Sequence, residues 1–150
     1  MRLVVQRVTK ATVHIEQKVY AEIGTGLCIL IGIEEDDNES DADWLATKVA
    51  GLRIFSDQQG LMNLSVNDTK GELMIISQFT LFASTKKGNR PSFIKSARPE
   101  KAIPLYEYFI RKLEGIVKVV IKTGRFGADM QINLINDGPV TIIIDSKLKE

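Results

Sequence analysis

The chain contains one cysteine and one histidine among its 150 residues. The single cysteine, Cys28, excludes an internal disulfide framework, and with His14 it supplies too few ligands for a zinc site of cysteines and histidines. The apolar sequence around Cys28 favours a small core residue. His14 stands between Val13 and Ile15 in an alternating segment, so we expect a strand histidine that faces solvent or a neighbour.

Long hydrophobic runs are also absent. The longest holds about seven residues, against the ~20 that a helix needs to cross a bilayer. The first seven residues become charged too soon for a secretory signal, so we expect a cytoplasmic protein without membrane contact. Twenty basic and nineteen acidic side chains give a net charge of +1. Any binding of nucleic acid must therefore rest on a local basic patch.

Signatures of common enzyme classes are missing as well. No Gly-x-Ser-x-Gly elbow, phosphate-binding loop or dinucleotide-binding motif occurs. The acidic residues 34–43 are typical of a solvated loop, although a magnesium ion held only by carboxylates stays formally open. The residues present therefore do not favour hydrolysis by a nucleophile that depends on a histidine base.

The pattern of apolar residues predicts many strands and two helices. The length and the hydrophobic content of 44% fit one globular domain over residues 1–150. Alternation and turn residues predict strands at 2–15, 19–23, 27–33, 61–64, 72–82, 116–123, 130–135 and 140–145. Helices are expected at 41–55, behind a capping box at Ser40 and Asp43, and at 99–114, where Pro104 would delay or bend the helix. We predict an α+β fold: a barrel-like, mostly antiparallel sheet with two main helices packed on it.

Two of these strands are interrupted by polar or turn residues. Ser77, Gln78 and Thr80 interrupt the segment 72–82, and Gly138-Pro139 separates the last two strands. Ser77 and Thr80 could simply face water, and Gly138-Pro139 could be an ordinary hairpin turn.

The segment 84–97 is expected to be a long surface loop. Residues 86–101 carry six cations against one acid, at Lys86, Lys87, Arg90, Lys95, Arg98, Lys101 and Glu100. This imbalance favours an anion-binding loop, and a solvated basic face is the alternative.

Five segments, in this order, are informative together: Met-Arg-Leu-Val-Val-Gln-Arg-Val at 1–8, Ser-Gln-Phe-Thr-Leu at 77–81, Lys-Gly-Asn-Arg-Pro-Ser-Phe at 87–93, Phe-Gly-Ala-Asp-Met at 126–130 and Asn-Asp-Gly-Pro-Val-Thr at 136–141. With them the chain resembles the D-aminoacyl-tRNA deacylase family. The resemblance implies hydrolysis of the ester between a D-amino acid, or glycine, and the 3′-terminal adenosine of tRNA. Such a reaction recycles mischarged tRNA. It also implies a homodimer that needs no metal or cofactor.

The same resemblance assigns roles to residues. Each active site would combine Ser77, Gln78, Phe79 and Thr80 of one subunit with a cis Gly138-Pro139 bond of the other. From the needs of ester hydrolysis we further hypothesise that backbone N–H groups around Gln78, Phe79 and Thr80 bind the oxyanion, if the strand is irregular enough to free them. The substrate's 2′-hydroxyl would assist, since the Thr80 hydroxyl has no visible base. The remaining residues would select the D-enantiomer and hold the adenosine (Phe126, Ala128, Met130), bind tRNA (Lys86, Lys87, Arg90) or support the Gly-Pro loop (Gln6, Arg7).

Three other interpretations remain open. A related deacylase family accepts L-aminoacyl esters but usually has Pro-Gln where this chain has Ser77-Gln78. A dimeric RNA-binding module without catalysis would explain the basic loop. A purely structural dimer is the third interpretation, although no positive feature favours it. Among single residues, Phe126 and Met130 could belong to the core, and Arg7 could form a surface ion pair.

Overall fold

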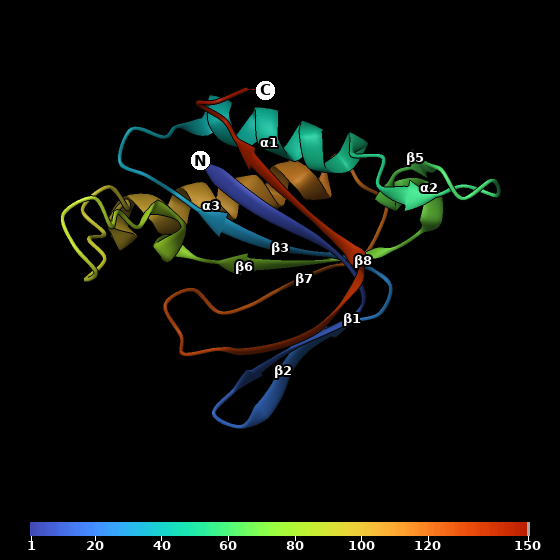
Figure 1. Cartoon of the computed structure of the whole chain (residues 1–150), viewed down its shortest axis with the longest axis horizontal. Helices are drawn as coiled ribbons and strands as arrows, with labels where there is room; N and C mark the ends of the chain where they lie inside the picture. Colours follow the sequence, from blue (N-terminus) through green and yellow to red (C-terminus); the bar gives the residue numbers. More distant parts are fainter. Residues whose placement is uncertain (150) are drawn as a thin grey trace.

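Strand β1 (Arg2–Ile15) is the organising element of the sheet, because three other strands pair with it. The computed structural model describes residues 1–149, and Figure 1 shows two helices stacked above a strongly curled sheet. The strand order is β2-β1-β3-β6-β7, with β8 also on β1. The bounds are β2 Lys18–Ile23, β3 Gly26–Gly32, β6 Glu72–Ser77, β7 Ile121–Thr123 and β8 Gln131–Asp145.

The curl explains the barrel-like shape. The first half of β1 pairs with β3 on one side and with the end of β8 on the other, and its second half pairs with β2 and the start of β8. Strands β3, β6 and β7 run parallel to one another. The sheet is therefore mixed and nearly closed, and the predicted antiparallel character holds around β1.

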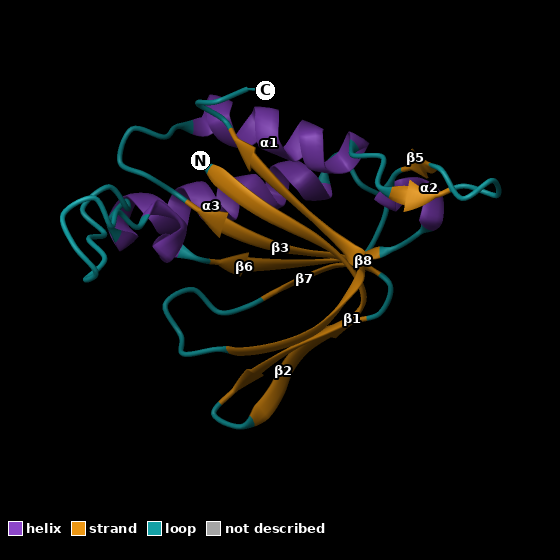
Figure 2. Ribbon diagram, in the orientation of Figure 1, coloured by secondary structure: helices purple, strands orange, loops and turns teal. Residues whose placement is uncertain are grey.

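Helices α1 (Glu39–Gly51) and α3 (Pro99–Glu114) cover one face of the sheet, as Figure 2 shows. One core cluster lies between these helices and the sheet, and it contains Leu45, Phe109 and Ile75. A second cluster fills the inside of the curl, where Cys28 and Met74 pack among residues of β1 and β2. The predicted single α+β domain with two main helices is confirmed, and β3 is buried on both faces, as its continuous apolar sequence predicts.

Small elements join these parts: β4 (Phe55–Ser56), β5 (Met62–Leu64), helix α2 (Val66–Thr69) and a 3-10 turn, η1 (Phe79–Phe82). Helix α1 begins two residues before the predicted start and ends at Gly51, with a capping box at Asn38 and Asp41. The Asn38 side chain accepts from the Ser40 N–H at 2.9 Å. Helix α3 has its predicted bounds and runs through Pro104 without a delayed start.

The structure differs from the predicted strands at three places. Strand β6 ends at Ser77, because its partner β3 ends at Gly32 and the chain then turns into η1. The segment 116–120 is no strand: Ile116 and Val117 donate to the carbonyl of Leu113 and continue the end of α3. Finally, residues 136–139 do not separate two strands, since β8 is continuous and accommodates them as a bulge.

Candidate active site

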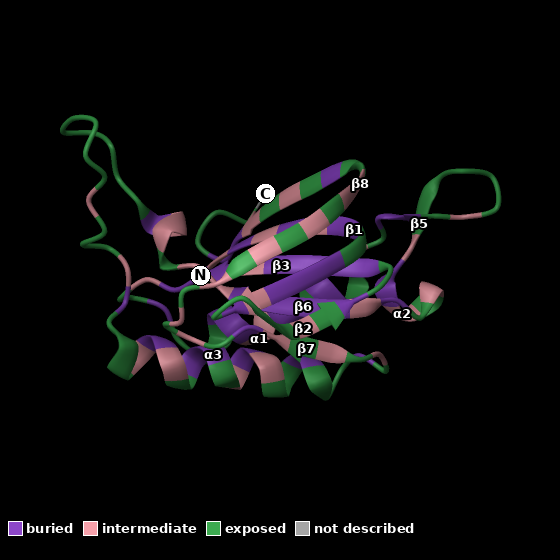
Figure 3. Cartoon of the chain, turned by 90° about the horizontal axis from the view of Figure 1, so that it is seen from below, coloured by how far each residue is buried: buried purple, intermediate pink, exposed green. Residues whose placement is uncertain are grey.

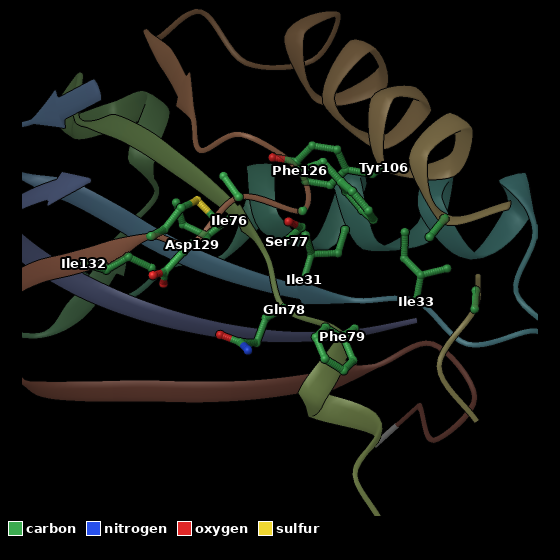
Figure 4. Close-up of a pocket in the computed structure, with 15 residues that line it drawn as sticks. Ile31, Ile33, Ile76, Ser77, Gln78, Phe79, Tyr106, Phe126, Asp129 and Ile132 are labelled. Carbon is green, nitrogen blue, oxygen red and sulfur yellow. The ribbon is translucent and has the colours of Figure 1, made fainter. Parts of the chain in front are cut away.

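A cavity of about 300 Å³ opens where β3 and β6 end. Its walls come from the ends of these strands, the start of η1, one face of α3 and the turn 126–130, as Figure 4 shows. Ser77, Gln78 and Phe79 line it, and Phe126, Ala128 and Met130 line the opposite side; Thr80 is the next residue of η1. The structure thus brings together two sequence segments that lie about fifty residues apart.

The backbone at the start of η1 has two N–H groups without a backbone acceptor. Gln78 donates its N–H to the carbonyl of Ile31 at 2.7 Å, and the next bond in the turn runs from Leu81 to the Gln78 carbonyl at 3.2 Å. Within residues 1–149 no protein acceptor receives the N–H of Phe79 or Thr80. The irregular backbone of η1 therefore leaves the N–H groups of Phe79 and Thr80 free, whereas the Gln78 N–H is engaged.

No side chain in this cavity forms a nucleophile–base pair. The Gln78 amide Nε2 donates to the Thr80 hydroxyl at 2.5 Å, so the Thr80 oxygen meets an amide rather than a base. His14 lies elsewhere, with its Nδ1 at 3.2 Å from the amide nitrogen of Asn133 on β8. This location agrees with a strand histidine that contacts a neighbour.

Arg2, which no sequence pattern indicated, holds the far end of η1. Its Nη1 donates to the Leu81 carbonyl at 2.8 Å, and its guanidinium lies 4.8 Å from the centre of the Phe82 ring. Asp145 holds the other side of the guanidinium, with Nη2 and Oδ2 separated by 2.9 Å. Arg2 therefore connects η1 to the adjacent ends of β1 and β8.

Tyr106, another residue that the sequence did not single out, forms the back wall. Its hydroxyl donates to the Ile75 carbonyl at 3.0 Å, and burial raises the pKa of this phenol, so it stays a neutral donor. The Phe126 ring stands edge-to-face against it, with centroids 5.7 Å apart. Asp129 also lines the cavity and places one carboxylate at its edge.

The Gly138-Pro139 segment forms a bulge in β8. Asn136 pairs with Val8 and Thr141 with Gln6, so the four residues 137–140 stand opposite Arg7 alone. The Gly138-Pro139 peptide bond is cis, Gly138 has φ +129°, and both residues are exposed. Neither of them lines the cavity of its own chain.

Arg7 lies directly behind this bulge. It is 9% exposed, so its ion pair with Asp137 starts from a buried guanidinium rather than from a surface side chain. Its Nη1 donates to the Ile54 carbonyl at 2.6 Å, and its Nε contacts both the carbonyl and the carboxylate of Asp137 at 3.2 Å. Gln6 contributes a longer bond to Thr141, at 3.4 Å. A β-carbon on Gly138 would come within 3.2 Å of Arg7 Nη2.

The loop 84–97 projects from the molecule beside the cavity, and Figure 3 shows it largely exposed. Lys86, Lys87 and Arg90 lie at its tip, and none of them has an ion-pair partner in the described part of the chain. The loop is thus a free cluster of positive charge. The long surface loop predicted from the sequence is confirmed.

Two features are absent from residues 1–149. No three histidine, cysteine, aspartate or glutamate side chains are grouped as a metal ion requires. No helix in this range is long and apolar enough to span a bilayer.

The fold and the sequence were compared with known proteins. A family model described as D-Tyr-tRNA(Tyr) deacylase matches residues 4–145. Curated proteins named D-aminoacyl-tRNA deacylase from Akkermansia muciniphila and Cytophaga hutchinsonii are 59% and 61% identical over 150 residues, which is the full length of this chain and of each relative.

Solved structures share the fold of this chain. A structure titled c-Myc DNA Unwinding Element Binding Protein has a TM-score of 0.92 and 39% identity, and the match covers 97% of this chain and 98% of that one. A probable eukaryotic D-amino acid tRNA deacylase shares the fold at 14% identity, with a TM-score of 0.79. Because the family model spans almost the whole chain and the relatives match it from end to end, this protein belongs to the D-Tyr-tRNA(Tyr) deacylase family and is a D-aminoacyl-tRNA deacylase, a hydrolase.

Proposed function

We propose that the protein hydrolyses the ester between a D-amino acid, or glycine, and the 3′-terminal adenosine of tRNA by main-chain catalysis alone. The observation that carries this mechanism is a pair of free N–H groups, on Phe79 at the cavity wall and on the next residue, Thr80, with no nucleophile–base pair beside them. The protein would act in the cytoplasm, without a metal or cofactor, and return uncharged tRNA for correct aminoacylation.

The two N–H groups would stabilise the oxyanion that forms when water attacks the ester carbonyl. A well-placed donor of this kind contributes about 3–4 kcal/mol to the transition state. The bond from the carbonyl carbon to the ribose 3′-oxygen then breaks, and that oxygen takes a proton as the free D-amino acid leaves. The neighbouring ribose 2′-hydroxyl would orient the water, because no protein base contacts the Thr80 hydroxyl.

The sugar and base would lie against the other wall of the cavity. Phe126 and Met130 offer apolar surfaces on which the terminal adenine can pack, and Ala128 leaves space between them. A D-aminoacyl group would then point toward the opening near Ser77 and Gln78.

Selection against L-amino acids would come from the Gly138-Pro139 bulge of a second copy. Its carbonyls would accept hydrogen bonds from the substrate's amino group, and an L-side β-carbon would collide with backbone that cannot turn aside. Glycine, which has no β-carbon, would pass. The support for this step is that the bulge is exposed, is held rigidly by Arg7 and is absent from the cavity of its own chain.

Mixed dimers test whether the site is shared. Gly138→Ala would disable the bulge, and Ala128→Trp would fill the cavity. If each site joins two subunits, equal co-expression should restore about a quarter of wild-type activity, because half of the dimers would contain one intact site. Activity that stays at the level of the separate variants would overturn the shared site.

The basic loop would dock the phosphates of tRNA. Replacement of Lys86 or Lys87 by alanine should weaken binding and lower the slope of log affinity against log salt by about one each. Lys48→Ala is a matched control, since Lys48 lies on α1 over the Trp44 ring, away from the loop. An unchanged slope in the loop variants would remove the loop from the proposal.

The decisive assay measures ester cleavage on D-alanyl-, L-alanyl- and glycyl-tRNA. We expect rapid cleavage of the D-alanyl and glycyl esters and almost none of the L-alanyl ester. Comparable cleavage of the L-alanyl ester would favour a chirality-relaxed deacylase.

A second candidate function is binding of nucleic acid in addition to ester cleavage. The unpaired cations of the loop favour it, and one similar structure carries the name of a DNA-binding protein. It predicts that the protein also binds nucleic acid without an aminoacyl ester, which a binding measurement on uncharged tRNA tests.

A further inference from the structure

The basic loop and the turn η1 are joined at both ends of the loop. The loop leaves directly after η1, at Ala83, and closes into a narrow tip through paired backbone bonds between Ser84 and Ser92 at 2.8 and 2.9 Å. It returns to the sheet where Ala97 donates to the Ile33 carbonyl at 2.9 Å. Ala97 itself lines the cavity. The loop is therefore connected to the site at both of its ends.

The returning segment, 93–96, crosses the residue that carries one of the free N–H groups. The Phe93 ring stands edge-to-face on the Phe79 ring, with centroids 5.2 Å apart and planes at 72°. Three residues later, the Ser96 hydroxyl donates to the Phe79 carbonyl at 2.8 Å. One contact thus fixes the side chain of Phe79, and the other fixes its peptide plane.

The Phe79 carbonyl belongs to the same peptide unit as the Thr80 N–H. Because a peptide unit is planar, the direction of this carbonyl also sets the direction of the N–H on its other side. A hydrogen bond to the carbonyl further polarises that unit and makes its N–H a stronger donor. The Ser96 hydroxyl can therefore control both the aim and the strength of the Thr80 N–H.

We propose that Ser96 is a positioning residue that couples docking of the substrate's RNA body on the basic loop to the geometry of the Thr80 N–H. This inference rests on the proposed function, in which that N–H binds the oxyanion. A phosphate backbone held by Lys86, Lys87 and Arg90 would draw the loop toward one arrangement and press segment 93–96 onto η1. The RNA body would thereby accelerate a reaction at its own 3′ end.

The coupling makes a specific kinetic prediction. Wild-type protein should cleave D-alanyl-tRNA with a higher kcat than D-alanyl-adenosine, which lacks the RNA body. In Ser96→Ala this advantage should shrink: kcat on the tRNA substrate falls about fivefold to tenfold, the usual size for one hydrogen bond, and by more than the kcat on D-alanyl-adenosine, while KM stays near wild type. Ser96→Thr, which keeps the hydroxyl, should restore the advantage.

Ser92→Ala is the matched control. Ser92 lies in the same loop, and within the described residues its hydroxyl makes no hydrogen bond, so its removal should leave both substrates unaffected. Phe93→Leu removes the ring contact and should reproduce the Ser96→Ala pattern by an independent route. If each variant unfolds in urea with the wild-type midpoint, its fold is intact and the kinetic losses come from the removed contact.

The outcomes separate the two proposals. Equal losses on both substrates in Ser96→Ala, or no loss on either, would overturn the coupling and leave the proposed function standing. A wild-type protein that cleaves neither substrate would overturn the proposed function and the coupling with it.

Discussion

The turn η1 follows the end of one strand of the sheet, and the Gly138-Pro139 bulge lies within another strand, but the two differ in their surroundings. The turn lies at the wall of a cavity formed by its own chain, whereas the bulge is exposed and lines nothing in its own chain. Each is held by an arginine of β1: Arg2 binds the Leu81 carbonyl, and Arg7 binds the Asp137 carbonyl. The comparison teaches that one strand can hold both halves of the proposed site, one half at the cavity of its own chain and one half exposed on the surface.

The largest effect should come from a methyl group in the bulge. In Gly138→Ala the new β-carbon would lie 2.7 Å from a methyl of Val140 at a φ of +129°, so the bulge must move. A displacement of about 1 Å in such a site lowers activity about 100-fold. The measurement is kcat/KM on D-alanyl-tRNA.

Gly60→Ala is the control for that substitution. Gly60 also has a positive φ, +80°, but nothing lies within 4 Å of its β-carbon position. It should cost about 1 kcal/mol of stability and leave kcat/KM unchanged. Wild-type activity in Gly138→Ala would mean that the bulge has no part in the site.

Replacement of Arg7 and of Arg2 should lower the free energy of unfolding by different amounts. Arg7→Met leaves the buried Ile54 carbonyl without its partner, so the free energy of unfolding should fall by about 2 kcal/mol. The Arg2 side chain is 33% exposed, and Arg2→Met should cost about 1 kcal/mol or less. Urea unfolding compares the two, and equal losses would contradict the difference in burial.

A smaller effect is expected at Thr80, on the inward half. Thr80→Val removes the hydroxyl but keeps the N–H, so single-turnover cleavage should fall by less than about tenfold, whereas loss of an essential acid–base group costs at least about 100-fold. Circular dichroism checks the fold of the variant. A fall to the uncatalysed rate would make Thr80 the essential group.

Substitution in the bulge should leave the reactivity of Cys28 unchanged, because Cys28 lies inside the curl of the sheet. Burial raises the pKa of its thiol to about 11, so at pH 8 only about 0.1% is thiolate. Alkylation of the native protein should be slow at pH 8, and should accelerate as pH rises toward 11 because deprotonation favours the reaction. The rate measured by mass spectrometry should be the same in Gly138→Ala; rapid labelling of the native protein would show that the interior opens.

The sequence predicted the parts of the fold that depend on local patterns. Alternation of apolar residues located β1, and their helical spacing located α3, each with the bounds that the structure has. It failed at 78–82, where the apolar pattern continues but the neighbouring strand has ended, so that pairing partners rather than side chains decide the conformation.

The candidate site divides in the same way. Residues 77–80, 126–130 and 138–139 were found from their resemblance to a family, and the structure brings the first two groups around one cavity. Arg2, Ser96 and Tyr106 were missed, because each acts on a backbone carbonyl that is distant in the sequence or carries no side-chain signal of its own. No periodicity or motif reports a bond of that kind.

The two unoccupied amides of η1 also bear on how such a site can change over generations. Every amino acid except proline supplies a main-chain amide, so replacements at positions 79 and 80 can alter shape and polarity while the reactive dipoles persist. Drift would thus be tolerated where most enzymes are strictly constrained, and proline alone would be forbidden at both positions.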